Sequence, residues 1–288
     1  MFAKYLAIFA ALIVAIPAAF AQTPVANLPA ETSVANPAKA SLELRALPPI
    51  WVGPALHAPG GRQGSASAAG TANSYNWDGY VVTGTSFTSA KGSWIVPSST
   101  CGKSPDSMTF FWVGIDGWGD NTVEQIGTAV ACEKTTPVYF AWYEFYPASS
   151  VSISTVPVKP GDTINATVTY QSSAFTLKIT DETTGQSFSI TQSATANRAS
   201  AEWIAEAPTV VTGIVSLADF TKVSFGDDTT GIAGTNAATD NAHSGPISAF
   251  GSSVLKVTEV DWLNYSEATP SALSADGTSF TSTWHEPY

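Results

Sequence analysis

The sequence is poor in charged residues, and basic residues are the scarcest of them. Only 12% of its 288 residues are charged, against roughly 25% in a typical soluble domain. The formal net charge is -11, and the sequence pI is about 4.5. We expect no nucleic-acid partner, because phosphate binding needs clustered Lys and Arg. An acidic chain with few charges suits low pH, where neutral carboxyl groups repel one another little. Simple acidic solubility is the alternative.

Several familiar catalytic motifs are missing. The chain has no GxSxG nucleophile elbow and no HExxH helix. The stretch DDTTG at 227–231 lacks the spacing of the pepsin-like Asp-Thr-Gly motif, and Asp227 and Asp228 are more typical of a solvated turn than of a calcium loop. A histidine triad or a histidine-rich metal site is not expected, because the three histidines are scattered. They are His57, His243 and His285. We therefore expect no metal and no cofactor.

Long apolar runs are missing beyond the N-terminus. The first 21 residues contain a positive Lys4, an apolar run and the small-x-small ending Ala19-Phe20-Ala21. This pattern is typical of a secretory signal peptide that is cleaved after Ala21. No other segment approaches the ~18 apolar residues of a membrane span. We expect a secreted protein, extracellular or periplasmic, that is free of the membrane after cleavage.

Cysteine is rare as well, with only Cys101 and Cys132 in the chain. Neither residue lies in a CxxC motif or in a nucleophile motif. In an oxidising compartment two such residues can form one disulfide. We expect a structural disulfide in preference to two free thiols.

Residues 22–70 differ in composition from the rest of the chain. They are rich in Ala, Pro, Ser and Gly and lack the alternation of strands, which is typical of a disordered or linker segment. The segment is weakly basic and precedes an acidic region. This order fits a propeptide that is held partly by electrostatics and removed at low pH; a flexible spacer is the alternative.

Residues 71–288 show a β pattern, from Asn76 onward, with no long stretch of helical periodicity. Short runs rich in Val, Ile, Thr and aromatic residues are bounded by Gly, Asp, Ser or Pro. The stretch ITDETTGQSFSI at 179–190 predicts a hairpin around a Thr-Gly turn. The pattern predicts one all-β domain over 71–288, a β-sandwich.

Several of the aromatic runs also carry polar residues on one face, because side chains alternate along a strand. The sets that share a face are Phe110, Trp112, Gly114 and Asp116; Val123, Gln125 and Gly127; Trp142, Glu144 and Tyr146; and Glu202, Ile204 and Glu206. Carboxylates on a buried face are costly unless they are paired or used. A concave face lined in this way predicts a groove for an extended polymer, either a sugar chain or a peptide.

Five stretches in this order, NWDGY, FFWVGIDG, VEQIG, AWYEFYP and AEWIAEAP, resemble the glutamic peptidase (eqolisin) family. The resemblance covers nearly the whole region from Asn76 to the C-terminus. It implies a sandwich of two antiparallel sheets with a lectin-like jelly-roll topology, and an acid endopeptidase with a Gln–Glu dyad. By position the dyad is Gln125 and Glu206. The implied substrate-binding residues are Trp112, Asp116, Trp142 and Glu144. We expect polypeptide substrates and a monomer.

The implied dyad suits chemistry in acid. Histidine is a poor general base there, since it is protonated below its pKa of about 6.5. Glu206 would take a proton from water and pass it to the leaving amine, while Gln125 would stabilise the oxyanion. Glu202 shares the face of Glu206 and is interpreted as a neighbour. The alternative function is a carbohydrate-binding or glycan-hydrolysing sandwich with Glu144 and Glu206 as its two acids.

Overall fold

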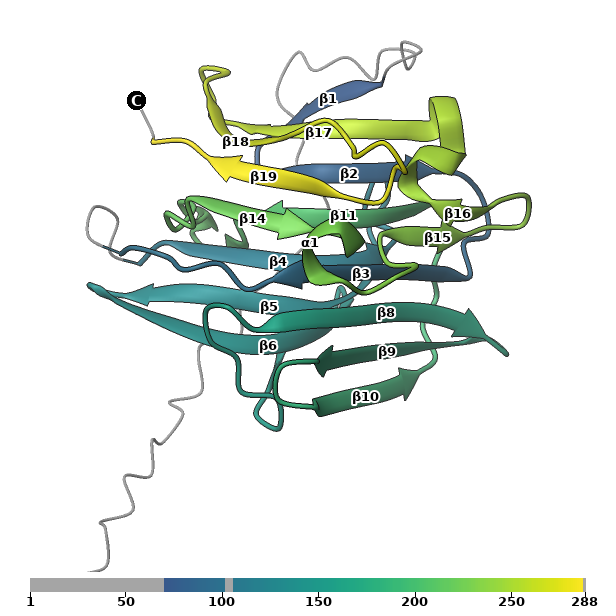
Figure 1. The fold of residues 1–288 in the computed structure, drawn as a ribbon, viewed down its shortest axis with the longest axis horizontal. Helices are drawn as coiled ribbons and strands as arrows, with labels where there is room; N and C mark the ends of the chain where they lie inside the picture. Colours follow the sequence, from purple (N-terminus) through teal and green to yellow (C-terminus); the bar gives the residue numbers. More distant parts are fainter. Residues whose placement is uncertain (1–69, 102–105, 287–288) are drawn as a thin grey trace, which may run out of the picture. The chain divides into compact units, whose positions relative to one another are not determined.

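A computed structural model describes residues 70–101 and 106–286. The predicted signal peptide and nearly all of the predicted propeptide lie outside the described residues. Most of the described chain is in strands (Figure 1), and its helical segments are the short helix α1 (Asp227–Thr230) and the 3-10 helix η1 (Ile247–Ser253). The expected all-β fold is confirmed.

The first layer has the strand order β7–β6–β5–β4–β11–β2–β17–β1. Its strands, in that order, are Val151–Ile153, Thr136–Tyr146, Val123–Glu133, Met108–Ile115, Ser200–Glu206, Trp77–Thr83, Val254–Val260 and Thr71–Ser74. The ladders of this layer are antiparallel except at its edge, where β1 runs parallel to β17. The layer therefore brings β11, β4, β5 and β6 side by side, although β11 follows β6 by more than fifty residues.

The second layer has the order β10–β9–β8–β3–β14–β19–β18, with the β15–β16 hairpin also paired to β3. Its strands, in that order, are Gln186–Gln192, Ala174–Asp181, Thr163–Gln171, Ser89–Ile95, Lys222–Phe225, Phe280–Trp284 and Ser266–Pro270, followed by Ala237–Thr239 and Ser244–Pro246. The predicted hairpin at 179–190 is confirmed by the β9–β10 ladder. A separate small hairpin joins β12 (Thr209–Val210) and β13 (Gly213–Ile214).

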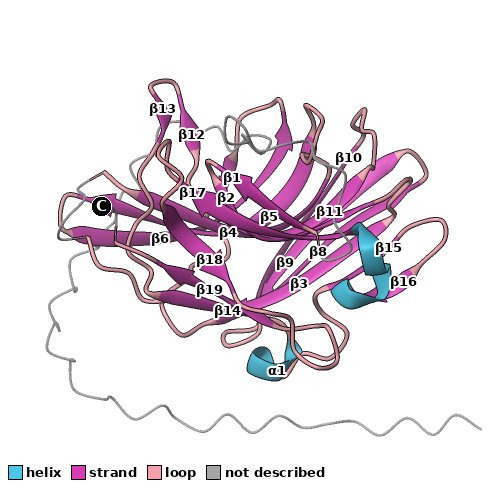
Figure 2. Cartoon of the chain, turned by 90° about the horizontal axis from the view of Figure 1, so that it is seen from above, coloured by secondary structure: helices cyan, strands magenta, loops and turns pink. Residues whose placement is uncertain are grey.

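The two layers pack face to face (Figure 2) and are joined along one side. The β17–β18 hairpin carries the hydrogen bonding from the first layer into the second, so the strands form one nearly closed sheet. The main hydrophobic core fills the space between the layers with large side chains, among them Trp94, Phe111, Ile126, Phe175 and Trp203. Strand β8 shows how this core selects residues, because its buried positions alternate with partly exposed ones.

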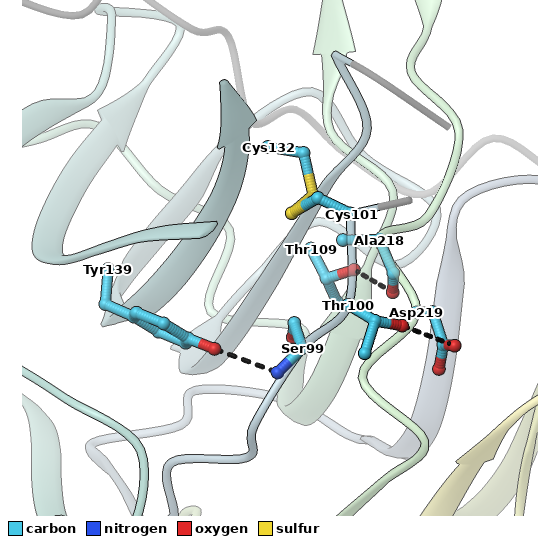
Figure 3. Close-up of a disulfide and its surroundings, with 8 residues drawn as sticks. All are labelled: Ser99, Thr100, Cys101, Thr109, Cys132, Tyr139, Ala218 and Asp219. Atoms are coloured by element: carbon cyan, nitrogen blue, oxygen red, sulfur yellow. Dashed lines mark hydrogen bonds between the residues drawn. A yellow bond between two sulfur atoms is a disulfide. The ribbon is translucent and has the colours of Figure 1, made fainter. Parts of the chain in front are cut away.

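The predicted disulfide is confirmed between Cys101 and Cys132 (Figure 3), whose Cα atoms lie 5.4 Å apart. It joins the segment before β4 to the end of β5, so it closes one end of the β4–β5 ladder. Next to it, the backbone N–H of Ser99 donates to the Tyr139 hydroxyl of β6 at 2.8 Å. Among the described residues, no helix has the length and apolarity to cross a bilayer.

Candidate active site

The predicted site residues lie on one face of the first layer. This face, which we call the site face, is the side of β2, β11, β4, β5 and β6 that bears a second buried cluster, separate from the core between the layers. Its aromatic members include Trp77, Phe110, Trp112, Phe140 and Trp142. Strand register orders the polar residues in a row across the layer: Glu202 faces Gly114, Gly114 faces Gln125, and Gln125 faces Glu144.

Glu206 lies four residues further along β11 than Glu202, opposite Phe110 on one side and Trp77 on the other. The Trp112 indole Nε1–H donates to its Oε2 at 2.7 Å, and the Asn76 Nδ2 donates to its Oε1 at 3.4 Å. The Glu206 side chain is fully buried. Each carboxylate oxygen of Glu206 therefore has a neutral N–H donor, which is the environment that an ionised base requires.

Burial is the main influence on the Glu206 carboxyl. It raises the pKa well above the usual range, since removal from water penalises the charged form. The Trp112 N–H lowers the pKa and the nearby Glu144 raises it, while the Trp77 indole and the Asn76 amide lower it. The net direction is upward, and the hydrogen-bond donors are the groups that favour the ionised form. Contact with water would remove the largest cause of this shift and leave the donors in place.

Gln125 is held by Glu144 on the neighbouring strand. Its Nε2 donates to Glu144 Oε2 at 2.7 Å, and both side chains are fully buried. A carboxamide nitrogen carries two hydrogens, and Glu144 takes one of them. The contact fixes which way the amide points, because only the nitrogen can donate to a carboxylate. Glu144, predicted to bind substrate, thus has an orienting role toward Gln125 in the structure.

Two glycines make room for the Trp112 indole. A Cβ atom at Gly114 would lie 2.8 Å from Trp112 Cζ3, and one at Gly127 would lie 2.7 Å from Trp112 Cβ. Trp77 packs edge-on against the indole, with ring centroids 4.8 Å apart. The ring is therefore confined on several sides, which aims its N–H at Glu206.

Trp142 and Asp116 were predicted to bind substrate, and the structure shows other contacts for both. Trp142 is buried and packs edge-on against Phe110 at 4.8 Å. The two Asp116 oxygens accept the backbone N–H groups of Arg198 and Ala199, each at 2.6 Å. Burial nevertheless raises the Asp116 pKa to about 6. Its carboxyl ties the turn after β4 to the start of β11, and a role toward substrate stays a prediction for both residues.

Sequence reasoning missed other members of the buried polar set. Asn76 belongs to the NWDGY stretch but received no role. Glu124 and Glu259 were not singled out, yet both are fully buried. Burial, with Asp116 nearby, raises the Glu124 pKa to about 9, and burial also raises that of Glu259. In strands that mix apolar and polar residues, the sequence pattern does not indicate which polar residues are buried.

Glu202 shares the site face with Glu206, as the alternation of β11 predicts. Burial is the main reason that its pKa is raised well above the usual range, and Asp116 adds to the effect. It contributes no hydrogen bond to Gln125 or Glu206 that the structure records. Its interpretation as a neighbour of the dyad stays a prediction.

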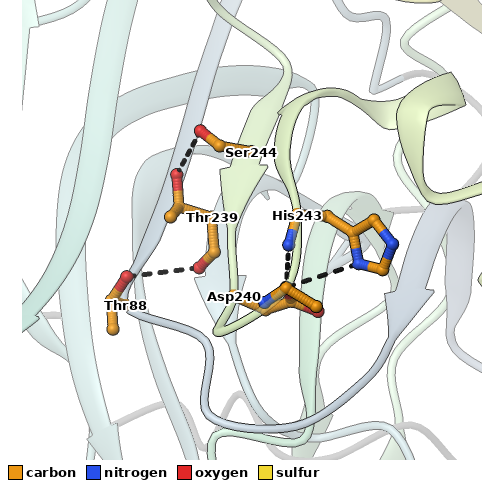
Figure 4. A network of polar contacts seen from close by, with 6 residues as sticks. Thr88, Thr239, Asp240, His243 and Ser244 are labelled. Carbon is orange, nitrogen blue, oxygen red and sulfur yellow. Dashed lines mark hydrogen bonds and ion pairs between the residues drawn. The ribbon is translucent and has the colours of Figure 1, made fainter.

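Two features outside the site face concern the motifs set aside earlier. His243 lies in the turn between β15 and β16 (Figure 4), where its Nδ1 is 3.5 Å from Asp240 Oδ1 and its backbone N–H donates to the same oxygen. Carboxylate oxygens of Asp227, Asp228 and Asp276 lie within 4.8 Å of one another. Asp227 accepts hydrogen bonds from neighbouring hydroxyl groups, and its two companions are exposed. Such exposed acidic groups are compatible with the solvated turn that the sequence predicts.

The nearly closed β-sandwich thus carries an oriented carboxyl and an oriented carboxamide on its site face. The model of the Peptidase A4 family matches residues 75–268, which include all five quoted stretches. The chain belongs to the Peptidase A4, or eqolisin, family.

Known relatives agree with this assignment. The chain is 32% identical to aspergillopepsin-2 of Aspergillus niger over 183 residues, 54% of this chain and 65% of the relative. It is 36% identical to scytalidopepsin B of Scytalidium lignicola over 137 residues, 46% of this chain and 51% of the relative. The matches thus span between half and two thirds of these curated relatives.

Solved structures support the fold. Scytalido-glutamic peptidase, determined with a transition state analog inhibitor, aligns with a TM-score of 0.60 and 25% identity, over 73% of this chain and 98% of that one. Aspergilloglutamic peptidase from Aspergillus niger aligns with a TM-score of 0.51 and 28% identity, over 62% and 99%. The expected sandwich fold is confirmed.

Proposed function

We propose that this protein is a secreted acid endopeptidase that hydrolyses peptide bonds with Glu206 and Gln125. The observation that carries the proposal is the pair of oriented side chains on the site face. Glu206 accepts from Trp112 and Asn76, and Gln125 donates to Glu144. Membership of the Peptidase A4 family supports the same reaction.

The mechanism needs three actions, and the two residues divide them. Ionised Glu206 takes a proton from water, whose oxygen attacks the carbonyl carbon of the scissile bond. Gln125 donates an amide N–H to the oxyanion that forms, and this neutral donor keeps its hydrogens at any acid pH. Glu206 then transfers its proton to the leaving nitrogen as the C–N bond breaks, which restores the carboxylate.

The substrates we infer are polypeptides, and the protein acts as a monomer without a nucleic-acid partner. An inhibitor that mimics a transition state is bound by the related scytalido-glutamic peptidase. The carbohydrate alternative would use Glu144 as a free acid, yet its Oε2 accepts the Gln125 amide. The geometry therefore favours the peptidase over the glycan-hydrolysing function.

The predicted propeptide, residues 22–70, would have to be removed for activity. We predict that the unprocessed chain is inactive. Mass spectrometry of the secreted protein after acidification should show a new N-terminus near residue 70. The new terminus should be absent in Glu206→Gln if the protein processes itself. Full activity in the intact chain would contradict this prediction.

The test of the function is digestion of denatured casein or haemoglobin at about pH 4, near the ordinary carboxyl pKa, with a pepstatin-type inhibitor present. We expect inhibitor-resistant cleavage by wild type and none by Glu206→Gln. The exposed residue Glu133 provides the matched control, and Glu133→Gln should cleave normally. Near-normal cleavage by purified, folded Glu206→Gln would overturn the proposal.

A further inference from the structure

One of the hydrogen-bond donors to Glu206 is itself held by a buried serine. Ser74, at the end of β1, contacts Asn76 and the start of β2 through its hydroxyl group. Its Oγ accepts the backbone N–H groups of Asn76 at 3.3 Å and Trp77 at 3.1 Å. The same Oγ–H donates to Asn76 Oδ1 at 3.1 Å. Ser74, Asn76 and Glu206 are all fully buried.

The hydrogen count sets the direction of this chain of contacts. A hydroxyl group has one hydrogen and two lone pairs. In Ser74 the hydrogen points to Asn76 Oδ1, because a carboxamide oxygen can only accept, and two backbone N–H groups donate to the Ser74 oxygen. The carboxamide oxygen of Asn76 therefore faces Ser74, and its NH₂ group faces Glu206. A flipped amide would place oxygen against the carboxylate and hydrogen against hydrogen, which is unfavourable on both sides.

The backbone holds the same segment against β11. The N–H of Ala207, directly after Glu206, donates to the Asn76 carbonyl at 3.0 Å. On the other side, Ser74 is in parallel register with Glu259 of β17. These contacts fix the position of Asn76 relative to Glu206 from two strands. The donor is thus preorganised, which is what a group must be to stabilise charge in a site.

The charged neighbours of Glu206 act against ionisation. Glu144 of β6 and Glu259 of β17 are the titratable groups that interact with it, and both disfavour its negative charge. Hydrogen-bond donors oppose them, namely the indoles of Trp112 and Trp77 and the amide of Asn76. The ionisation of Glu206 in acid thus depends on these neutral donors.

We propose that Ser74 and Asn76 are positioning residues for Glu206: the Ser74 hydroxyl fixes the Asn76 amide, whose N–H stabilises the Glu206 carboxylate. The proposal rests on the proposed function, in which Glu206 must be ionised to accept a proton from water. The 3.4 Å contact is long, as catalytic hydrogen bonds often are before substrate binds. The serine and the asparagine would therefore set how far into acid the enzyme works.

The test is the pH dependence of kcat and KM for purified, processed enzyme. In Asn76→Ala the apparent pKa at which kcat falls in acid, the acid limb, should rise by about one pH unit. At pH values below this pKa, that shift is a tenfold loss of kcat. Ser74→Ala should move the acid limb in the same direction by less, and Ser74→Thr, which keeps the hydroxyl, should restore it. KM should change little. Ser93 is a buried, hydrogen-bonded serine of the second layer, and Ser93→Ala should leave the limb in place.

A second readout needs no turnover. The infrared carbonyl band of protonated Glu206, taken as wild type minus Glu206→Gln, should titrate at higher pH in the Asn76→Ala background. The positioning role of Ser74 and Asn76 would be overturned if kcat fell equally at every pH while the acid limb and the infrared band stayed in place. That outcome would leave the proposed peptidase function unaffected. If wild type cleaves no protein, the proposed function fails, and the infrared titration still decides whether Asn76 controls the ionisation of Glu206.

Discussion

The two faces of the first layer both bear fully buried side chains but differ in chemistry. Phe111 on the inner face is 1% exposed and Trp112 on the site face is 0% exposed. The inner face packs mostly aliphatic and aromatic side chains against the second layer, and Glu124 lies on it opposite Ile115 and Phe145. The site face combines aromatic rings with Gln125, Glu144 and Glu206.

This difference separates the residues that stabilise the fold from those that serve the site. Burial of apolar surface contributes favourably to folding. Burial of a carboxyl costs free energy unless the group is protonated or paired. Substitutions on the inner face should therefore mainly lower the free energy of unfolding. Substitutions on the site face should mainly lower activity. Four experiments test this contrast.

The largest effect should come from pH, because buried carboxyls must stay protonated. The Glu124 pKa is raised from 4.5 to about 9, so the folded state binds a proton that the unfolded chain releases. Its contribution to stability is complete below about pH 4.5 and is lost as the pH rises toward 9, at about 1.4 kcal/mol per pH unit. Urea unfolding at a series of pH values should show wild type losing stability, and Glu124→Gln should flatten the slope. An unchanged slope would exclude Glu124 as the cause.

A large core truncation should come next. Phe111 packs edge-on against Phe220, with ring centroids 5.3 Å apart, in the core between the layers. Phe111→Ala should reduce the free energy of unfolding by about 3–5 kcal/mol. Denaturant unfolding at about pH 4 measures this loss of free energy. Phe111→Leu fills more of the cavity and should reduce the free energy of unfolding clearly less. A loss below about 1 kcal/mol would mean that the inner face does not carry the stability.

The matched change on the site face is Gln125→Ala. Removing one oxyanion donor in other enzymes costs on the order of 10²–10³ in rate, and we expect a loss of this size in kcat. The stability should fall far less than in Phe111→Ala. Steady-state kinetics and unfolding of the same preparation give both numbers. A variant that keeps its activity would remove Gln125 from the mechanism.

The smallest effect should come from Glu144→Gln. The new carboxamide can still accept from Gln125, but it loses the charge that strengthens the contact. We expect kcat to fall about tenfold or less. The same lost charge no longer raises the Glu206 pKa, so the acid limb should move to lower pH, opposite in sign to Asn76→Ala. A limb that moves upward would contradict the electrostatic coupling.

The sequence alone predicted much of the fold because alternation is a local property. The strand containing Glu202, Ile204 and Glu206 places Ile204 in the site-face cluster, as its period of two requires. The hairpin at 179–190 and the disulfide were also predicted correctly. Each of these features depends on spacing along the chain or on the small number of cysteines.

The rest depends on contacts that spacing does not encode. Asn76 contacts Glu206 although the two residues are 130 positions apart in the sequence. The sequence near either residue does not indicate this contact. Glu124 is buried because β5 is covered on both faces, so alternation gives no polar side to recognise. The join between the layers depends on where the β17–β18 hairpin lies in space, which a pattern of short strands leaves open.

The two glycines beside Trp112 have a practical consequence for any redesign of this protein. A methyl group at Gly127 would also lie 2.1 Å from the Phe111 carbonyl oxygen, which is backbone and cannot turn aside. Random libraries should therefore tolerate no side chain at this position, even when cleavage preference is changed elsewhere. Gly127 and Gly114 should therefore be kept as glycine, and variation is better directed to exposed turns such as the β12–β13 hairpin.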